Sequence, residues 1–473
     1  MRRSIYWQER LSPERLAPLQ ETISCDFAIV GGGISGLSAA QALVELEPRA
    51  SIVVLERDYC GAGATGASSG FITPDSESQV HDLVRRFGDG DARFLWLQAM
   101  AGCGRIRENA GRIHQAGGRC DLVELDSVYV ATDGRASRVT AGEHRDRLRL
   151  GLDSRLYSAD EVPALLGASG YGSAVRYSGT FAIDPFAYIT GLRNLLGTAG
   201  VKIFESSFAT RVSGTRITTL SGSVDASAVI VALDRFAARD GFEKNDTYQA
   251  QTALVLSEPL CPALFRSIFP GGPVMAWESD LLYRYFRPVG DDRILIGGGL
   301  VSQTYRRKVR NDSLIADNLV ASFRKTFRKL RGVAFDCWWP GMIGVTKDFL
   351  PIAGPDPSRP GIFLAICPAG LPWGVMVGAE AARQAAGRPG LLQKFLKPGR
   401  GFTDLDALDP LLPRGPIVAL SNYYAKTALR GGSREIIART RWIRALAALI
   451  AGSWLLRMIA RRKRSRRSWF HLG

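Results

Sequence analysis

The sequence lacks the features of a disulfide-stabilised or zinc-binding protein. Its cysteines number seven, an odd count, and they are scattered along 473 residues without a C-x-x-C pair. They are Cys25, Cys60, Cys103, Cys120, Cys261, Cys337 and Cys367. A disulfide framework or a structural zinc site needs closely spaced pairs, so the pattern indicates reduced thiols in a cytosolic setting and no metal site.

Histidine is also scarce, and the N-terminus lacks an apolar run. The four histidines lie outside any motif, which favours solvated surface side chains over catalytic bases. Residues 1–20 carry charges but no apolar run of about seven residues or more, so they do not form a secretory signal. We expect a polar lead-in to the first strand.

Positive charge is in excess, but most of it lies at one end of the chain. There are 61 Lys and Arg against 45 Asp and Glu, a formal net charge of +16. Residues 426–473 contain thirteen Lys or Arg and one acid, which accounts for +12 and leaves +4 for the rest. Because RNA enzymes usually spread basic charge around the active site, a nucleic-acid partner is disfavoured.

The basic tail also contains an apolar stretch. Within residues 442–460, a run of twelve residues between Arg444 and Arg457 carries no charge, and RRKRSRR follows at 461–467. We expect residues 442–467 to attach the protein to an anionic membrane surface at the cytoplasmic face, as an interfacial helix with a polybasic anchor. A short transmembrane segment and a solvated tail that touches nucleic acid are the alternatives.

Strand and helix patterns divide the rest of the chain. Apolar strands are predicted at 26–30 and 51–55 with a helix between them, a β-α-β unit that implies parallel strands. Residues 248–300 are rich in strand patterns, and a strand–turn–helix pattern begins at 361. Further elements are helices near 89–116, 184–200 and 314–331 and strands at 122–131 and 224–232. This order predicts an α/β fold.

The predicted organisation is a Rossmann-like nucleotide-binding domain built from discontinuous segments, with an inserted mixed-sheet substrate domain. The nucleotide-binding segments are 25–80, 181–240 and 331–395. The other ranges are a lead-in (1–24), a mixed segment partly in the substrate domain (81–180), the substrate domain itself (241–330), a Pro/Gly-rich linker (396–428) and a helical tail (429–473).

A dinucleotide fingerprint lies in the first β-α-β unit. Gly31, Gly33 and Gly36 form G-x-G-x-x-G between strand and helix. The first glycine permits the tight turn, the second lets a pyrophosphate approach, and the third allows close packing of the helix. Glu56 ends the second strand, where a carboxylate binds the adenosine ribose and disfavours a 2′-phosphate. A similar pattern at 61–66 precedes no helix, so we interpret it as a loop near the cofactor.

These segments resemble the D-amino-acid oxidase superfamily of FAD-dependent amine and amino-acid oxidoreductases. The resemblance is carried by GGGISGLSAA and VVLERDYCGAGATGASSGF, and later by RILIGGG and WWPGMIGVTKDFLPIAGPDP. The lead-in SIYW is similar to the branch that contains gamma-glutamylputrescine oxidoreductase. The resemblance covers roughly residues 4–395 and implies FAD as the cofactor and a fold of the glutathione-reductase-2 type. Because no second strand–GxGxxG–helix unit occurs in the sequence, we expect one dinucleotide site and no separate nicotinamide domain.

The resemblance also implies which residues contact FAD. They are Gly31, Gly33, Ser35, Gly36, Glu56, Arg57, Ala67, Ser68, Ala209, Gly370, Leu371 and Gly374. The last three would lie in the turn over the flavin pyrimidine. This turn departs from the family pattern, because it has Cys367-Pro-Ala-Gly370 and no lysine. The departure leaves both oxygen and a membrane quinone or carrier open as electron acceptors. A covalent flavin link through Cys337 or Cys367 is disfavoured relative to a buried thiol.

The implied activity is oxidation of the C–N bond of an amine or amino acid to an imine by hydride transfer to FAD. An FAD-dependent RNA-modifying or RNA-binding protein that uses the basic tail is the alternative. Tyr283, Tyr285 and Arg287 alternate along a predicted strand and share one face. They are candidates for binding a substrate carboxylate, although an ordinary sheet face with a snorkelling arginine gives the same pattern.

Overall fold

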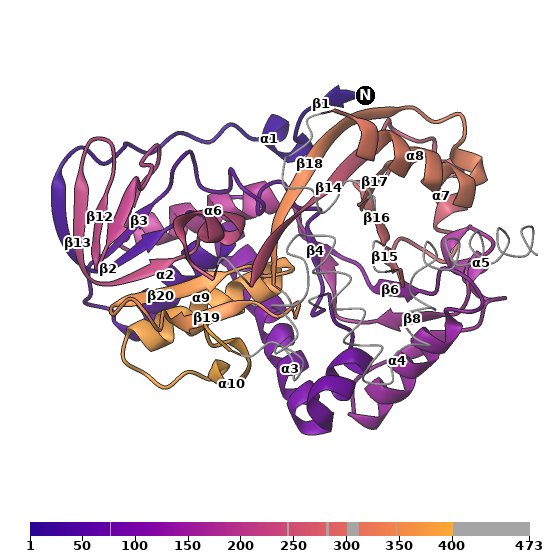
Figure 1. Cartoon of the computed structure of the whole chain (residues 1–473). Coiled ribbons are helices and arrows are strands. Elements are labelled where there is room, and N and C mark those ends of the chain that lie inside the picture. The colour runs from indigo at the N-terminus through magenta and orange to yellow at the C-terminus, as the bar shows by residue number, and fades with distance from the viewer. Residues whose placement is uncertain (76, 244–245, 281–282, 300–311, 347, 401–473) are drawn as a thin grey trace, which may run out of the picture.

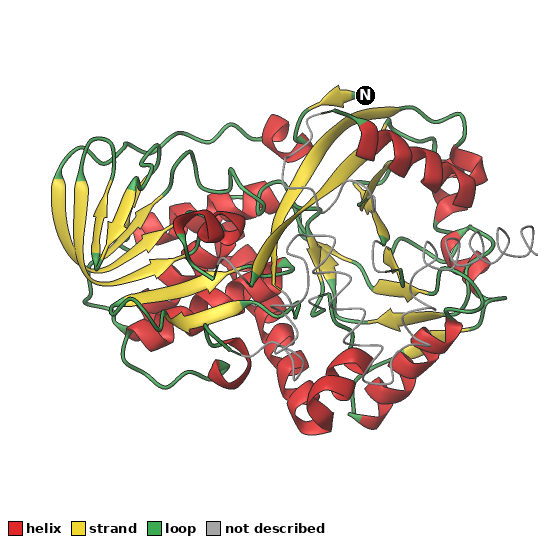
Figure 2. Cartoon of the chain, viewed as in Figure 1, coloured by secondary structure: helices red, strands yellow, loops and turns green. Residues whose placement is uncertain are grey.

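The computed structural model describes most of the chain. The described residues are 1–75, 77–243, 246–280, 283–299, 312–346 and 348–400. They form two large β-sheets, a small third sheet and the helices around them (Figures 1 and 2). The predicted α/β class with mixed sheets is confirmed. The predicted helical tail lies outside the described residues.

One large sheet is built on the predicted β-α-β unit. Strands β2 (Thr22–Val30) and β3 (Ile52–Leu55) pair in parallel, and α2 (Ile34–Leu46) connects them. All of β3 and the last four residues of β2 are buried, as is typical of parallel strands covered on both faces. The parallel pairing predicted from the sequence is confirmed.

Distant segments complete this sheet. Its strand order is β10-β3-β2-β13-β12-β11, and β20 pairs with both β13 and β19. The added strands are β10 (Lys202–Phe204), β11 (Arg211–Ser213), β12 (Arg216–Thr218), β13 (Ser223–Val231), β19 (Ile352–Pro355) and β20 (Ile362–Ile366). Three separated stretches of chain therefore meet in one sheet, with β2, β3, β10, β13 and β20 parallel at its centre.

The nine-stranded sheet forms the other lobe in Figure 1. Its order is β1-β18-β14-β17-β16-β15-β6-β8-β7, and the long strands β14 and β18 pair antiparallel. The strands are β1 (Arg2–Arg3), β6 (Ser127–Val130), β7 (Arg155–Tyr157), β8 (Ala174–Tyr177), β14 (Thr247–Ser257), β15 (Met275–Glu278), β16 (Arg284–Val289), β17 (Arg293–Gly298) and β18 (Phe335–Thr346). The strand-rich interpretation of residues 248–300 is thereby confirmed.

Helices cover both sheets. Helix α3 (Val80–Gln115) begins earlier than the predicted helix near 89–116, because the chain continues through a kink at Gly88, where φ is 78°. Helix α9 (Leu371–Ala385) packs directly against α2. The others are α1 (Tyr6–Arg10), α4 (Ser137–Arg149), α5 (Val162–Leu166), α6 (Pro185–Thr198), α7 (Pro262–Ile268), α8 (Leu314–Thr326), α10 (Gln393–Leu396) and the 3-10 helices η1 (Asp234–Asp240) and η2 (Arg328–Leu330).

The N-terminal lead-in is more than a polar connection, which corrects the expectation from the sequence. Trp7 on α1 is 1% exposed and its indole Nε1 donates to the carbonyl of Ser68 at 2.9 Å. The Trp339 indole on β18 donates to the carbonyl of Ala67 at 2.8 Å, and the two indoles meet edge to face. Two tryptophans therefore hold a loop that precedes the small sheet of β4 (Phe71–Ile72), β9 (Phe181–Ala182) and β5 (Val123–Glu124).

The predicted membrane segment cannot be compared with the structure. Residues 442–467 lie outside the described part of the chain. Among the helices that the structure does describe, none is long and apolar enough to cross a membrane.

Candidate functional site

A cavity of about 910 Å³ lies where β2 ends and α2 begins. It is lined by the glycine turn at one end and by Gly370 and Leu371 at the other. This volume falls in the range of small-molecule and cofactor sites, roughly 300–1,000 Å³. Ligands of parallel α/β sheets bind outside the carboxyl ends of the strands, and this cavity has that position.

The three fingerprint glycines have different surroundings. Gly31 has φ of +117°, and a Cβ there would lie 2.4 Å from the carbonyl oxygen of Ala232. A Cβ on Gly36 would lie 1.9 Å from the carbonyl oxygen of Gly31, so this glycine is needed for helix packing and does not line the cavity. A Cβ on Gly33 would meet only the Thr65 hydroxyl, at 3.3 Å, because this position faces the cavity.

The N-terminus of α2 opens on this cavity. Gly33 is the N-cap residue and has no side chain that could cap the helix, and no acidic residue lies in the first turn. The amide of Ile34 donates to the Thr65 hydroxyl at 3.0 Å, and Ser35 lines the cavity. Free amides and the positive end of the helix dipole suit an anionic group here. Thr65, which the sequence analysis missed, belongs to the loop at 61–66.

Glu56 lies at the end of β3 beside the glycine turn. Its carboxylate accepts hydrogen bonds from the backbone amides of Gly32 at 2.8 Å and Asp58 at 2.9 Å. Burial raises the pKa of Glu56, and the two amides act in the opposite direction. Arg57, the next residue, is exposed and lies over the ring of Phe236 at 4.9 Å. Both Glu56 and Arg57 line the cavity.

The other predicted contact residues divide between positions in and away from this cavity. Ser68, Ala209, Gly370 and Leu371 line it, whereas Ala67 lines the smaller pocket described next. Gly374 is a correction, because it lies inside α9 and not in the preceding turn. A Cβ on Gly374 would lie 2.4 Å from Cγ2 of Ile34, so its small size allows α9 to pack on α2.

An arginine-rich segment lines the cavity where no motif indicated one. In η1, Arg235 and Arg239 lie over the ring of Phe236, at 4.0 and 5.9 Å. The arginines that line the cavity are Arg57, Arg211, Arg235, Arg239 and Arg359. Their positive charge favours a ligand with anionic groups. This segment follows β13. Its position after the carboxyl end of a parallel strand was the only feature of the sequence that could have placed it at the cavity.

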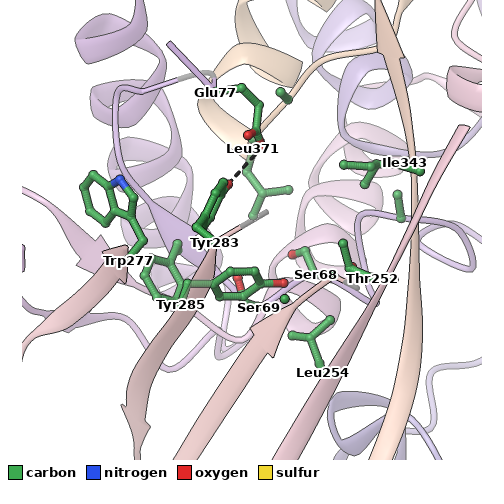
Figure 3. Close-up of a pocket in the computed structure, with 18 of the residues that line it drawn as sticks. Ser68, Ser69, Glu77, Thr252, Leu254, Trp277, Tyr283, Tyr285, Ile343 and Leu371 are labelled. Carbon is green, nitrogen blue, oxygen red and sulfur yellow. Dashed lines mark hydrogen bonds between the residues drawn. The ribbon is translucent and has the colours of Figure 1, made fainter. Parts of the chain in front are cut away.

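A smaller pocket of about 220 Å³ adjoins the first (Figure 3). The two share lining residues, namely Ala64, Ser68, Ile343, Gly370 and Leu371. Tyr283 and Tyr285 both line the smaller pocket, as do Trp277 and Thr252. Burial raises the pKa of Tyr285, so its hydroxyl stays protonated and able to donate. The structure therefore brings together the two predicted tyrosines with residues from other strands.

Arg287 does not join the tyrosines in this pocket, which corrects the carboxylate-binding hypothesis for it. Its guanidinium donates to three backbone carbonyls: Ser69 at 2.7 Å, Ile183 at 3.0 Å and Pro288 at 3.0 Å. Burial lowers its pKa to about 10, and it lies over the Trp7 ring at 5.2 Å. Because its guanidinium is hydrogen-bonded to these carbonyls, Arg287 holds the loop that contains Ser69 in place.

A comparison with known protein families shows the family to which this chain belongs. Residues 26–386 match the family described as FAD dependent oxidoreductase, the D-amino-acid oxidase type. The chain belongs to this family. The matched stretch contains the glycine turn, Glu56, η1, the two tyrosines and Gly370. It thus confirms the resemblance and the FAD requirement expected from the sequence.

Curated and solved relatives agree with this assignment. Gamma-glutamylputrescine oxidoreductase of Escherichia coli (strain K12) is 28% identical over 354 residues, which are 72% of this chain and 80% of that protein. The crystal structure of glycine oxidase from Geobacillus kaustophilus aligns with a TM-score of 0.68 at 19% identity, covering 80% of this chain and 99% of that one. L-proline dehydrogenase from P. horikoshii aligns with a TM-score of 0.63 at 15% identity, covering 80% and 97%. The RNA-modifying alternative finds no support in these comparisons.

Proposed function

We propose that this FAD-dependent oxidoreductase oxidises the C–N bond of a small amine or amino acid to an imine. The observation that carries the proposal is the 220 Å³ pocket, which shares five lining residues with the 910 Å³ cavity. A small substrate in the smaller pocket would lie next to a cofactor in the larger cavity. The names of the relatives, which include oxidoreductases of amines and amino acids, support the same chemistry.

The larger cavity fits FAD in shape and charge. The open position at Gly33 and the start of α2, with Ser35, would hold the diphosphate. Glu56 would accept from the adenosine ribose, with Arg57 beside it, and Ala209 would contact the adenine. Gly370 and Leu371, which line both pockets, would contact the flavin ring. When bound, FAD would supply the acceptor for one hydride, which carries two electrons and one proton.

The chain's own residues bind and orient the substrate in this proposal. Tyr285 is near the Thr252 hydroxyl, and both can hydrogen-bond a substrate group. Leu254 and Ile343 also line the pocket, and their aliphatic side chains would help to exclude water from the reacting carbon. Hydride transfer requires the neutral amine, and none of the described histidines lines either pocket. In this proposal the enzyme therefore binds the neutral form of the amine directly from solution, and no described histidine removes its proton.

Purified protein should be yellow, and one or more amines or amino acids should bleach its flavin absorbance under anaerobic conditions. Reoxidation of the bleached protein by air or by a soluble quinone would then identify the acceptor. Colourless protein that cannot be reconstituted with FAD contradicts the cofactor assignment. Flavin that no amine or amino acid bleaches, but that dithionite reduces, contradicts the substrate assignment alone.

We also propose that residues 442–467 attach the protein to the cytoplasmic face of a membrane, where a quinone or carrier is an accessible acceptor. The support is the sequence: an uncharged run between Arg444 and Arg457 followed by RRKRSRR. Deletion of residues 429–473 should abolish sedimentation with vesicles of anionic lipid and leave substrate bleaching intact. Vesicles of neutral lipid are the control. Membrane binding that persists after the deletion would contradict this attachment.

A further inference from the structure

The loop of residues 67–70 lies at the junction of the two cavities. Ser68 lines both of them, and all four residues line the smaller pocket (Figure 3). With the sequence Ala-Ser-Ser-Gly, the loop has only small side chains, which bury little apolar surface. Loops are usually more mobile than the elements they connect. The position of this loop must therefore depend on contacts that its backbone makes with other parts of the chain.

Each of the four backbone carbonyls in this loop accepts a hydrogen bond from a distant part of the chain. The indole of Trp339 on β18 donates to the carbonyl of the first loop residue at 2.8 Å. The indole of Trp7 on α1 donates to the second at 2.9 Å, and the guanidinium of Arg287 on β16 donates to the third at 2.7 Å. The backbone amide of Ile183 donates to the fourth at 3.0 Å. Three side chains from three elements therefore fix the course of the loop.

The three side-chain donors form one buried cluster. Trp7 and Trp339 are each 1% exposed, and Arg287 is 4% exposed. The two indoles meet edge to face at 6.4 Å, and the Arg287 guanidinium lies 5.2 Å from the centre of the Trp7 ring. Burial lowers the pKa of Arg287 to about 10, so it is still charged at neutral pH and its hydrogen bonds are charge-assisted. Because each donor contacts another, displacement of one would disturb its neighbour.

The N-terminal segment that carries Trp7 is attached on both sides of this residue. Before it, β1 pairs in parallel with β18, and the amide of Ser4 donates to the carbonyl of Trp338 at 3.1 Å. After it, Arg10 forms an ion pair with Asp121 at 2.7 Å. The position of Trp7 is therefore tied to β18, the strand that also supplies the second indole.

Gly70 lets the loop approach the guanidinium closely. Its φ is +71°, and a Cβ there would lie 2.1 Å from the carbonyl oxygen of Ile183 and 3.0 Å from Nη2 of Arg287. Residues with a side chain rarely adopt this φ, and the space does not admit a Cβ. Since Gly70 also lines the smaller pocket, only the loop backbone separates that pocket from the buried cation.

We propose that Trp7, Trp339 and Arg287 are positioning residues, which hold loop 67–70 so that a substrate in the smaller pocket is aligned with FAD in the larger cavity. This inference rests on the proposed function and deepens it. None of the three is among the described residues that line either cavity, so they act through the loop carbonyls. Alignment matters because a displacement of about 1 Å at the reacting atoms can slow an enzymatic step about hundredfold.

Hydrogen exchange of the full-length protein, followed by mass spectrometry, tests the hold on the loop without a substrate. Trp7→Phe and Trp339→Phe each remove an indole N–H and keep a buried ring. Exchange in a peptide that spans residues 67–70 should become about tenfold faster, because the loop opens more often. Trp96→Phe is the matched control: Trp96 on α3 is also 1% exposed, and this variant should leave the exchange of that peptide unchanged. Unchanged exchange in Trp7→Phe and Trp339→Phe would overturn the inference.

Anaerobic rapid mixing with an amine or amino acid that bleaches the flavin tests the alignment. The concentration dependence separates the dissociation constant of the substrate from the rate constant of flavin reduction. Trp7→Phe and Trp339→Phe should each lower the rate constant about tenfold and change the dissociation constant less than about twofold, because the other walls of the pocket remain. Weaker binding at an unchanged rate constant would show that the loop is only a wall of the pocket, and would overturn the inference.

A double variant shows whether the two tryptophans act on the same loop. If they do, Trp7→Phe with Trp339→Phe should slow reduction little more than the more damaging single variant, since one displacement of the loop already costs the alignment. Single effects that multiply in the double variant would show independent sites and contradict the shared role.

Arg287→Lys distinguishes the hydrogen bonds of Arg287 from its charge. Lysine keeps the positive charge but has no planar fork for several carbonyls. This variant should therefore show the same pattern as the tryptophan variants, with faster exchange of the loop and slower flavin reduction. Wild-type behaviour of Arg287→Lys would show that the charge alone is needed, which contradicts the positioning role.

The two proposals fail in different ways. If no amine or amino acid bleaches a flavin that dithionite reduces, the proposed function is overturned and the alignment role with it. If substrates bleach the flavin and the tryptophan variants are reduced as fast as wild type, the proposed oxidation of C–N bonds stands and the inference alone is overturned. Faster loop exchange together with slower reduction at unchanged substrate affinity supports both.

Discussion

Replacing Gly33 by valine is expected to give folded but colourless protein. The position has ordinary φ of −87°, so valine meets no left-handed strain, and an added Cβ would contact only the Thr65 hydroxyl at 3.3 Å. The side chain instead extends into the cavity at the start of α2, where the diphosphate of FAD would lie. We expect FAD affinity to fall at least about hundredfold, or ~2.7 kcal/mol, measured by titrating apoprotein with FAD.

Two further glycine variants separate cofactor binding from folding. Gly36→Ala should destabilise the protein itself, because the new Cβ would lie 1.9 Å from the carbonyl oxygen of Gly31. Gly104→Ala on α3 has no atom within 4 Å of the new Cβ and should retain both fold and colour. If Gly33→Val protein is purified with a full complement of FAD, the glycine turn is not the diphosphate site.

The sequence was most informative where the relevant residues are close together along the chain. The strand, glycine turn, helix and Glu56 fall within one β-α-β unit, whose geometry is constrained by local backbone rules. Gly31, Gly36 and Glu56 therefore have the neighbours that the motif predicts. The loop at 61–66 was also correctly separated from the true fingerprint, because no helix follows it.

The smaller pocket was less predictable, because its described lining residues come from five separated stretches of chain. Asp75 and Glu77 lie in an irregular segment before α3, and Trp277 lies on β15. A period of two places Tyr283, Tyr285 and Arg287 on one face of a strand but does not reveal what that face meets. The two tyrosines meet the pocket, whereas Arg287 meets the carbonyls of Ser69 and Ile183.

The residue between the two tyrosines was overlooked for a related reason. Arg284 points to the opposite face of β16, where it forms an ion pair with Glu278 of β15 and donates to the carbonyl of Ser322 on α8 at 2.8 Å. Tyr171 also donates to Glu278, at 2.9 Å. Burial lowers the pKa of Arg284, but the attraction of Glu278 outweighs it and the pKa is raised. The pair therefore anchors the strand that presents both tyrosines.

Arg284→Met should consequently be the most destabilising of the single substitutions considered, because it removes the guanidinium that forms an ion pair with the buried carboxylate of Glu278. We expect a loss of about 3–5 kcal/mol in the free energy of unfolding, measured by urea denaturation followed through tryptophan fluorescence. The double variant Arg284→Met with Glu278→Leu removes both charges and should recover most of this loss. If the Arg284→Met protein still folds, it should also bind substrate more weakly, because Tyr283 and Tyr285 would no longer be held in place.

An exposed ion pair provides a control that shows how much of the loss of stability depends on burial. Arg216 and Asp225 form a pair between β12 and β13, with side chains 52% and 43% exposed, against 9% and 1% for Arg284 and Glu278. Arg216→Met should cost at most about 1 kcal/mol, because solvent screens the remaining carboxylate. Equal losses at the two sites would mean that Arg284 contributes by packing alone. A large loss at Arg284 that the Glu278→Leu change reverses would identify the lost ion pair with the buried Glu278 carboxylate as its cause.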